Sequence, residues 1–145
     1  MSRLEGKIAV ITGANSSIGM ATAKTFLDEG AARVYITGRR KAELDAAAAT
    51  LGPHAVAGNV ADPADMDRLF ELVKGAAGRV DIVFANAGYA AAAPLGNITE
   101  EHVHGLLNTN VKGVIWTVQK ALPLMGPGGS IILSSSIVGS KGFGN

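Results

Sequence analysis

Apolar residues along this chain gather in short runs that are separated by longer amphipathic stretches. The first run, Ile8 to Ile11, leads through a turn of small residues into an amphipathic stretch that begins near Ile18. A short continuous apolar run is typical of a strand buried on both faces, whereas apolar positions three or four apart are typical of a helix packed on one side. The chain is therefore predicted to open with a strand, a tight turn and a helix.

The same alternation continues to the end of the chain. Further strands are predicted at Arg33–Thr37, His54–Gly58, Val80–Ala85 and Ser130–Ser135. Helices are predicted at Lys41–Leu51, after Asp62, and from Thr99 to about Leu124, where Gly126–Gly129 interrupts the pattern. Asp62 followed by Pro63 is a helix-start signal, because a carboxylate accepts from the free N–H groups and proline fits the first helical position.

Strands that alternate with helices of this length imply a parallel sheet covered on both faces, with right-handed crossovers. We predict an α/β fold with a doubly wound parallel sheet, the Rossmann fold, in strand order 3-2-1-4-5. Residues 1–145 are expected to form a single domain, because no linker or low-complexity tract interrupts them.

Composition narrows the classes of function. The 145 residues carry a formal charge of +1 and scattered basic residues, which gives no reason to expect nucleic acid as a partner. The absence of cysteine excludes disulfides and thiol chemistry. No apolar leader or membrane-length apolar run is present, so we expect no membrane association and a cytoplasmic location.

Ligands of doubly wound sheets bind at the carboxyl ends of the strands. In this chain those ends are Gly13–Gly19, Gly38–Arg40, Asn59-Val60, Asn86–Gly88 and Ser134–Ser136. All of them are rich in small, polar or basic residues. Gly13 and Gly19 alone also fit a tight turn without a ligand, but the agreement among five strand ends predicts a ligand site.

These segments resemble motifs of the short-chain dehydrogenase/reductase family, of which the chain would be the N-terminal portion. The family's Thr-Gly-x-x-x-Gly-x-Gly turn corresponds to Thr12–Gly19, with Ser17 in place of the middle glycine. Its Asn-Asn-Ala-Gly segment corresponds to Ala85–Gly88 and its Asn-Val-x-Gly segment to Asn110–Gly113. Ser135–Gly139 corresponds to its Ser-Ser-x-x-Gly segment.

The resemblance implies a dinucleotide cofactor. Its binding residues are expected to be Gly13, Asn15, Ser16, Ser17, Ile18, Gly19, Gly38, Arg39, Arg40, Asn59, Val60, Asn86, Ala87 and Gly88. Asn59 stands where the family has aspartate, and its amide oxygen is expected to accept from the adenine amino group. NADP is favoured over NAD, because an arginine after the second strand suits a 2′-phosphate and an acid there suits a 2′-hydroxyl. Alternatively, Arg39 and Arg40 form a solvated helix start.

The resemblance also implies hydride transfer between the nicotinamide and a small-molecule carbonyl or secondary alcohol. The family's catalytic tetrad consists of Asn, Ser, Tyr and Lys. Ser136 matches the serine that orients the carbonyl, and Asn110 matches the asparagine that anchors a relay water. Neither Tyr35 nor Tyr89 has a lysine four residues later, and the family's Tyr-x-x-x-Lys would fall just beyond Asn145. We therefore interpret the chain as truncated; the alternatives are a non-catalytic dinucleotide-binding module and a pseudo-enzyme.

Asn110 lies inside the predicted long helix, where asparagine has low propensity, so a local distortion is expected there. A chain that stops here is also expected to expose its last strand as a sheet edge. The helix face formed by Val114, Trp116, Val118 and Leu122 would lack neighbours. The resemblance implies a homotetramer.

We expect the 145-residue chain, expressed alone, to show no turnover with any carbonyl substrate and to self-associate through its exposed edge. Sedimentation velocity and a cofactor oxidation assay measure the two properties. A clean monomer in sedimentation would contradict the exposed-edge argument.

Overall fold

The computed structural model describes residues 2–52 and 54–141, so the expected domain end at Asn145 lies outside the described part. Within that part, five parallel strands form one sheet in the order β3-β2-β1-β4-β5, which confirms the predicted topology. The strands are β1 (Ile8–Thr12), β2 (Arg33–Gly38), β3 (His54–Ala57), β4 (Val80–Ala85) and β5 (Met125–Leu133).

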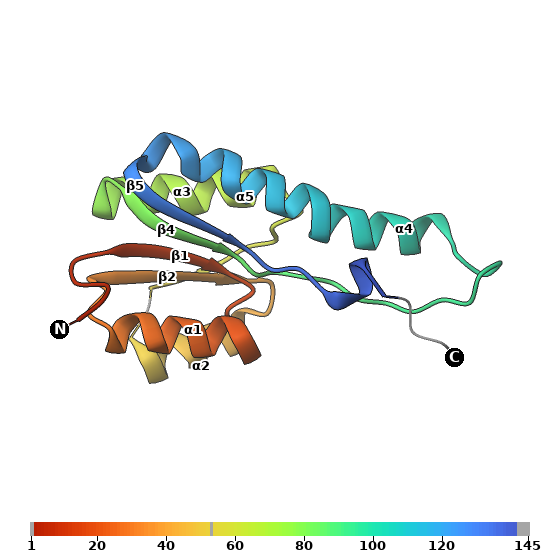
Figure 1. Cartoon of the computed structure of the whole chain (residues 1–145), viewed down its shortest axis with the longest axis horizontal. Coiled ribbons are helices and arrows are strands. Elements are labelled where there is room, and N and C mark those ends of the chain that lie inside the picture. The colour runs from red at the N-terminus through yellow and green to blue at the C-terminus, as the bar shows by residue number, and fades with distance from the viewer. Residues whose placement is uncertain (1, 53, 142–145) are drawn as a thin grey trace.

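Helices connect the strands and cover both faces of the sheet. They are α1 (Ser17–Asp28), α2 (Lys41–Leu51), α3 (Pro63–Ala77), α4 (Glu100–Leu107) and α5 (Gly113–Ala121). Figure 1 shows α1 and α2 on one face, α3 and α5 on the other, and α4 continuing past the end of the sheet. None of the described helices combines the length and the apolar character that crossing a membrane requires.

Alternate side chains of β1, in the middle of the sheet, enter two separate cores. Ile8 and Val10 of β1 pack with the apolar face of α3, while Ala9 and Ile11 pack with α1 and α2. All four are buried, as expected for strands covered on both sides. This double burial explains why the apolar runs in the sequence are continuous and do not alternate.

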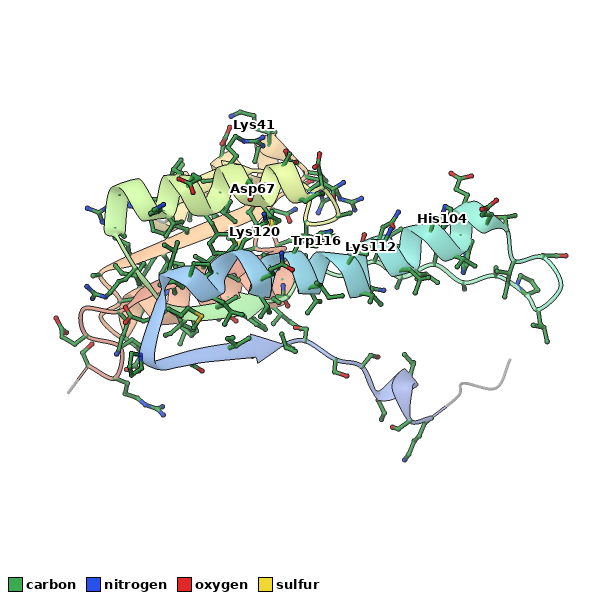
Figure 2. The ribbon with its side chains drawn as sticks, turned by 90° about the horizontal axis from the view of Figure 1, so that it is seen from above. Lys41, Asp67, His104, Lys112, Trp116 and Lys120 are labelled. Atoms are coloured by element: carbon green, nitrogen blue, oxygen red, sulfur yellow. The ribbon has the colours of Figure 1, made fainter. Side chains whose placement is uncertain are left out.

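As predicted, Asp62 caps α3, its carboxylate accepting from the N–H of Ala64 at 2.9 Å. On this face of the sheet, α3 and α5 are joined by packing and by an ion pair. Lys120 of α5 lies 2.5 Å from Asp67 of α3, and Figure 2 shows the two side chains between the helices. Trp116, also on α5, packs partly buried against the adjacent core.

The predicted long helix is continuous but not uniform. It begins after Thr99, whose hydroxyl accepts from the N–H of His102, and contains a π-helical turn at Asn108–Lys112. A 3₁₀ turn at Leu122–Leu124 ends it. The distortion expected at Asn110 is therefore confirmed, because this residue lies within the π-helical turn.

The predicted bounds of the last strand were wrong. The strand was expected at Ser130–Ser135, but β5 begins at Met125, which pairs with Val80, and ends at Leu133. The glycine-rich residues 126–129 form an irregularity between the pairs Val80–Met125 and Ile82–Ser130. Glycine, including Gly128 at φ +82°, lets the backbone depart from the ladder without ending the strand.

The predicted exposure of β5 is confirmed, but the predicted exposed face of the helix is only partly right. Residues of β5 after Met125 are exposed along one sheet edge. Of the predicted helix face, only Leu122 is exposed, while Val114, Trp116 and Val118 are half-buried. The exposed apolar side chains instead follow a neighbouring stripe: Val103, Leu107, Val111, Ile115 and Leu122.

Asp81 fastens β4 to the start of β1. Its carboxylate accepts from the N–H of Ile8 at 2.8 Å and from Arg79 Nε at 3.2 Å. Burial alone would raise the pKa of Asp81, but the hydrogen bond from Ile8 and the charges of Arg79 and Lys7 lower it below the ordinary value of 3.8. Asp81 thus stabilises the fold as a carboxylate.

We expect Asp81→Asn to lower the free energy of unfolding near neutral pH by about 1–2 kcal/mol, because a charge-assisted hydrogen bond becomes a neutral one. A carboxylate with a lowered folded-state pKa contributes fully above 3.8, and the contribution is lost as the pH falls through the folded-state value. Urea titrations should therefore show that the unmodified protein and Asp81→Asn differ less in free energy of unfolding as the pH falls below the folded-state pKa of Asp81. Asp28→Asn, which alters an exposed pair with Lys24, is the control; a pH-independent loss in Asp81→Asn would contradict this role.

Candidate functional site

A cavity of about 370 Å³ lies at the carboxyl ends of the strands. It is lined by Gly13, Asn15, Ser16, Ser17, Ile18, Gly38, Arg39, Arg40, Gly58, Asn59, Val60, Asn86, Ala87, Gly88 and Thr109. The structure thus brings together every residue predicted to bind cofactor except Gly19. Sequence reasoning missed Gly58 and Thr109. Gly58 was assigned to the preceding strand, and Thr109 reaches the cavity only through the path of the long helix.

Gly19 does not line the cavity, but its lack of a side chain permits close packing beside it. A Cβ atom there would lie 2.6 Å from the Gly13 carbonyl oxygen and 2.8 Å from Asn86 Nδ2. Gly13 has φ +64°, and a Cβ on it would lie 2.7 Å from Ala87 Cα. The turn after β1 and the segment after β4 are therefore in contact at positions that only glycine fits.

Thr12 and Asn86 join these two segments through hydrogen bonds. The Thr12 hydroxyl accepts from the N–H groups of Asn86 (3.1 Å) and Ala87 (3.0 Å). Asn86 Nδ2 donates to the carbonyl oxygens of Thr12 and Gly13, each at 3.2 Å. Ser134, just after β5, donates its hydroxyl to Asn86 Oδ1 at 3.1 Å. Asn86, predicted to bind cofactor, thus holds three strand ends in position.

The N-terminus of α1 contributes the first wall of the cavity. Ser16 precedes the helix, is extended, and makes no side-chain capping bond within the described residues. Since the first turn also holds no acidic residue, its N–H groups and the positive end of the helix dipole favour an anion. Ser17, the first helical residue, has φ +50°, a left-handed conformation that glycine adopts more readily.

The basic residues after β2 form the second wall. Arg39 is exposed and, among the residues that the structure describes, its side chain makes no hydrogen bond or ion pair. Arg40 Nη1 lies 2.8 Å from Glu43 Oε1. Asn15 crosses from the glycine-rich turn to this wall, its Oδ1 lying 3.0 Å from where a Cβ of Gly38 would be.

The segment after β3 is held by Asp65. The N–H of Asn59 donates to Asp65 Oδ2 at 2.7 Å and lowers the pKa of Asp65; burial opposes this effect, and Arg68, 2.9 Å away, adds to it. Asn59 Oδ1 accepts from the N–H of Ala61 at 3.1 Å. A carbonyl oxygen has two lone pairs, so one remains for a ligand, and the predicted adenine contact stays a prediction.

The two predicted catalytic residues do not line the cavity. The Asn110 amide is paired with the Tyr89 backbone: Oδ1 accepts from its N–H and Nδ2 donates to its carbonyl oxygen, both at 2.8 Å. Asn110 thereby fixes the chain just beyond Gly88. Ser136 is exposed and precedes a 3₁₀ turn at Ile137–Gly139, where its hydroxyl accepts from Val138.

Comparison with known proteins identifies the family. The protein-family model described as short chain dehydrogenase matches residues 7–145. The chain therefore belongs to the short-chain dehydrogenase family, as its motifs predicted. Among solved structures, a short-chain dehydrogenase/reductase from Brucella melitensis, described as glucose/ribitol dehydrogenase, matches with TM-score 0.89 and 28% identity. That match covers 93% of this chain and 58% of the other.

Curated relatives with similar sequences are oxidoreductases. The oxidoreductase asL5 of Sarocladium schorii is 54% identical over 146 residues, covering 98% of this chain. The NADP-dependent (R)-specific alcohol dehydrogenase of Lentilactobacillus kefiri is 37% identical over 147 residues, covering 97% of this chain. In each case the chain spans 58% of the relative's length.

We expect Ser17→Gly to raise the free energy of unfolding by about 1 kcal/mol, because glycine removes the penalty of a left-handed backbone at this position. Urea unfolding measures the change. Ser16→Gly is a matched control at an extended position, where glycine only adds freedom to the unfolded chain and should be neutral or destabilising. Equal effects of the two substitutions would contradict a specific strain at Ser17.

Proposed function

We propose that this chain is the cofactor-binding portion of an NADP-dependent short-chain dehydrogenase/reductase. The reaction is hydride transfer between the nicotinamide and a carbonyl or secondary alcohol, for which the bound dinucleotide supplies or accepts the hydride. The observation that carries the choice of NADP is the exposed Arg39 on the wall of the cavity, directly after Gly38.

The residues around the cavity suit a dinucleotide in charge and in hydrogen-bond donors. Gly13 and Gly19 leave no room for side chains and pack the turn after β1 closely against Ala87 and Asn86. The uncapped first turn of α1 presents N–H donors suited to a pyrophosphate. No carboxylate is among the side chains that line this cavity. A polyanionic ligand thus meets donors and cations on the walls formed by the described residues.

Arg39 suits a 2′-phosphate better than a 2′-hydroxyl. A guanidinium forms paired, charge-assisted hydrogen bonds with phosphate oxygens. The position before it is Gly38, which has no carboxylate to accept from a ribose hydroxyl. The relative from Lentilactobacillus kefiri is described as NADP-dependent, which agrees with this proposal.

The chemical step requires residues that hold the substrate and move its proton. We propose that Ser136 orients the substrate carbonyl through its hydroxyl. Asn110 holds the segment after Gly88 through Tyr89, which supports a positioning role next to the proposed nicotinamide subsite. Since the chain spans 58% of its relatives, the group that exchanges the proton is proposed to lie in residues beyond Asn145.

We expect Arg39→Ala to weaken NADPH binding about ten- to a hundredfold while changing NADH binding little, because a phosphate contact to arginine is strong and a hydroxyl contact is not. Fluorescence titration of the two cofactors measures both constants. Arg3→Ala removes an equal charge from the exposed N-terminal segment and should change neither constant. Equal losses for NADPH and NADH in Arg39→Ala would refute the 2′-phosphate role.

A further inference from the structure

Glu43, in the first turn of α2, connects two walls of the cavity. Its Oε2 accepts from Asn15 Nδ2 at 2.9 Å, and its Oε1 lies 2.8 Å from Arg40 Nη1. Asn15 belongs to the glycine-rich turn after β1, and Arg40 immediately precedes α2. One carboxylate therefore binds a neutral donor from one wall and a cation from the other.

Glu43 does not itself line the cavity, whereas Asn15 and Arg40 do. Its influence on a ligand is therefore exerted through these two side chains and through its charge. Arg39 and Arg40 are adjacent in sequence, but only Arg40 has an acidic partner in the described part of the chain. The pairing leaves the charge of Arg39 available and offsets that of Arg40.

A carboxylate at this position acts differently on a phosphate and on a hydroxyl. A doubly charged 2′-phosphate near Arg39 and Arg40 is attracted by both guanidinium groups and repelled by Glu43. A neutral 2′-hydroxyl interacts only weakly with the net charge of the same wall. Glu43 therefore lowers the affinity for a 2′-phosphorylated nucleotide, changes the affinity for the 2′-hydroxyl form little, and so reduces the difference between the two affinities.

We propose that Glu43 is a positioning and specificity-determining residue that limits preference for 2′-phosphorylated nucleotides. It does so by pairing with Arg40, and it orders the ribose side of the cavity by holding Asn15. This inference rests on the proposed function, since it assigns the 2′-phosphate subsite to the wall of Arg39 and Arg40. Replacing the charge of Glu43 while keeping its hydrogen bond should release Arg40 toward the ligand.

Glu43→Gln makes that change, because the glutamine oxygen can still accept from Asn15 but no longer carries charge. The probes are adenosine 2′,5′-bisphosphate and adenosine 5′-monophosphate, which differ only in the 2′-phosphate. In calorimetric titrations, the Glu43→Gln variant should bind the bisphosphate about three- to tenfold more tightly than the unmodified 145-residue chain does. The two proteins should bind the monophosphate equally. The gain should diminish with added salt.

Two further variants separate charge from structure. Glu43→Asp retains the charge and should keep the bisphosphate affinity close to that of the unmodified chain. Asp45→Asn removes the same charge from the same helix, where Asp45 pairs with Lys41, and should leave both affinities unchanged. Thermal unfolding of each variant should give nearly the same midpoint, because Glu43 and Asp45 are exposed.

The outcomes distinguish the inference from the proposed function. If the bisphosphate binds more tightly than the monophosphate, Arg39→Ala abolishes that preference, and Glu43→Gln changes nothing, the inference is overturned and the proposed function stands. An equal gain for both nucleotides in Glu43→Gln also overturns it, because the effect then does not depend on the 2′-phosphate. If the unmodified chain shows no preference and Arg39→Ala has no effect, both fail together.

Discussion

The cavity depends on the hydrogen bonds between Thr12 and Asn86. The Thr12 hydroxyl accepts from two backbone N–H groups. The Asn86 amide donates to two carbonyl oxygens of the opposite segment and accepts from the hydroxyl of Ser134. These groups lie at the ends of adjacent parallel strands, where the ladder stops and backbone polar groups would otherwise lack partners. Because the bonds also bring Ala87 against Gly13, they determine how closely the two loops approach and hence the shape of the cavity between them.

The remaining walls are held by similar hydrogen bonds, in which a side chain of one element bonds to the backbone or to a side chain of another. Asp65 of α3 holds Asn59, Asn110 of the π-helical turn holds Tyr89, and Glu43 of α2 holds Asn15. Each contact lies close to a strand end, so loops that differ in sequence are held at one edge of the sheet. The cavity is thus assembled from short polar bridges over an apolar double core, and its chemistry can vary without changes to that core.

The sequence predicted the strand order, the Asp62 cap, the distortion at Asn110 and nearly all residues that line the cavity. It did so because those features are local: apolar runs, cap residues, and small or polar residues directly after strands. It failed at the start of β5, where Gly126–Gly129 carries a break signal but Met125, before the glycines, still pairs with Val80 of β4, so the strand continues across an irregularity. It also could not predict the bonds of Asp81 to Ile8 or of Glu43 to Asn15, because nothing in the spacing of such residues specifies which distant partner each will meet.

Thr12 and Asn86 are far apart along the chain, so the cavity exists only after β4 has joined β1. A nucleotide that requires this cavity binds the folded chain and not the unfolded one. At a free concentration one hundred times its dissociation constant, such a ligand stabilises the folded state by about 2.7 kcal/mol. With the nucleotide binding proposed above, the cellular supply of that ligand would also act on the abundance of this protein, since chains without ligand unfold more often and are exposed to proteolysis.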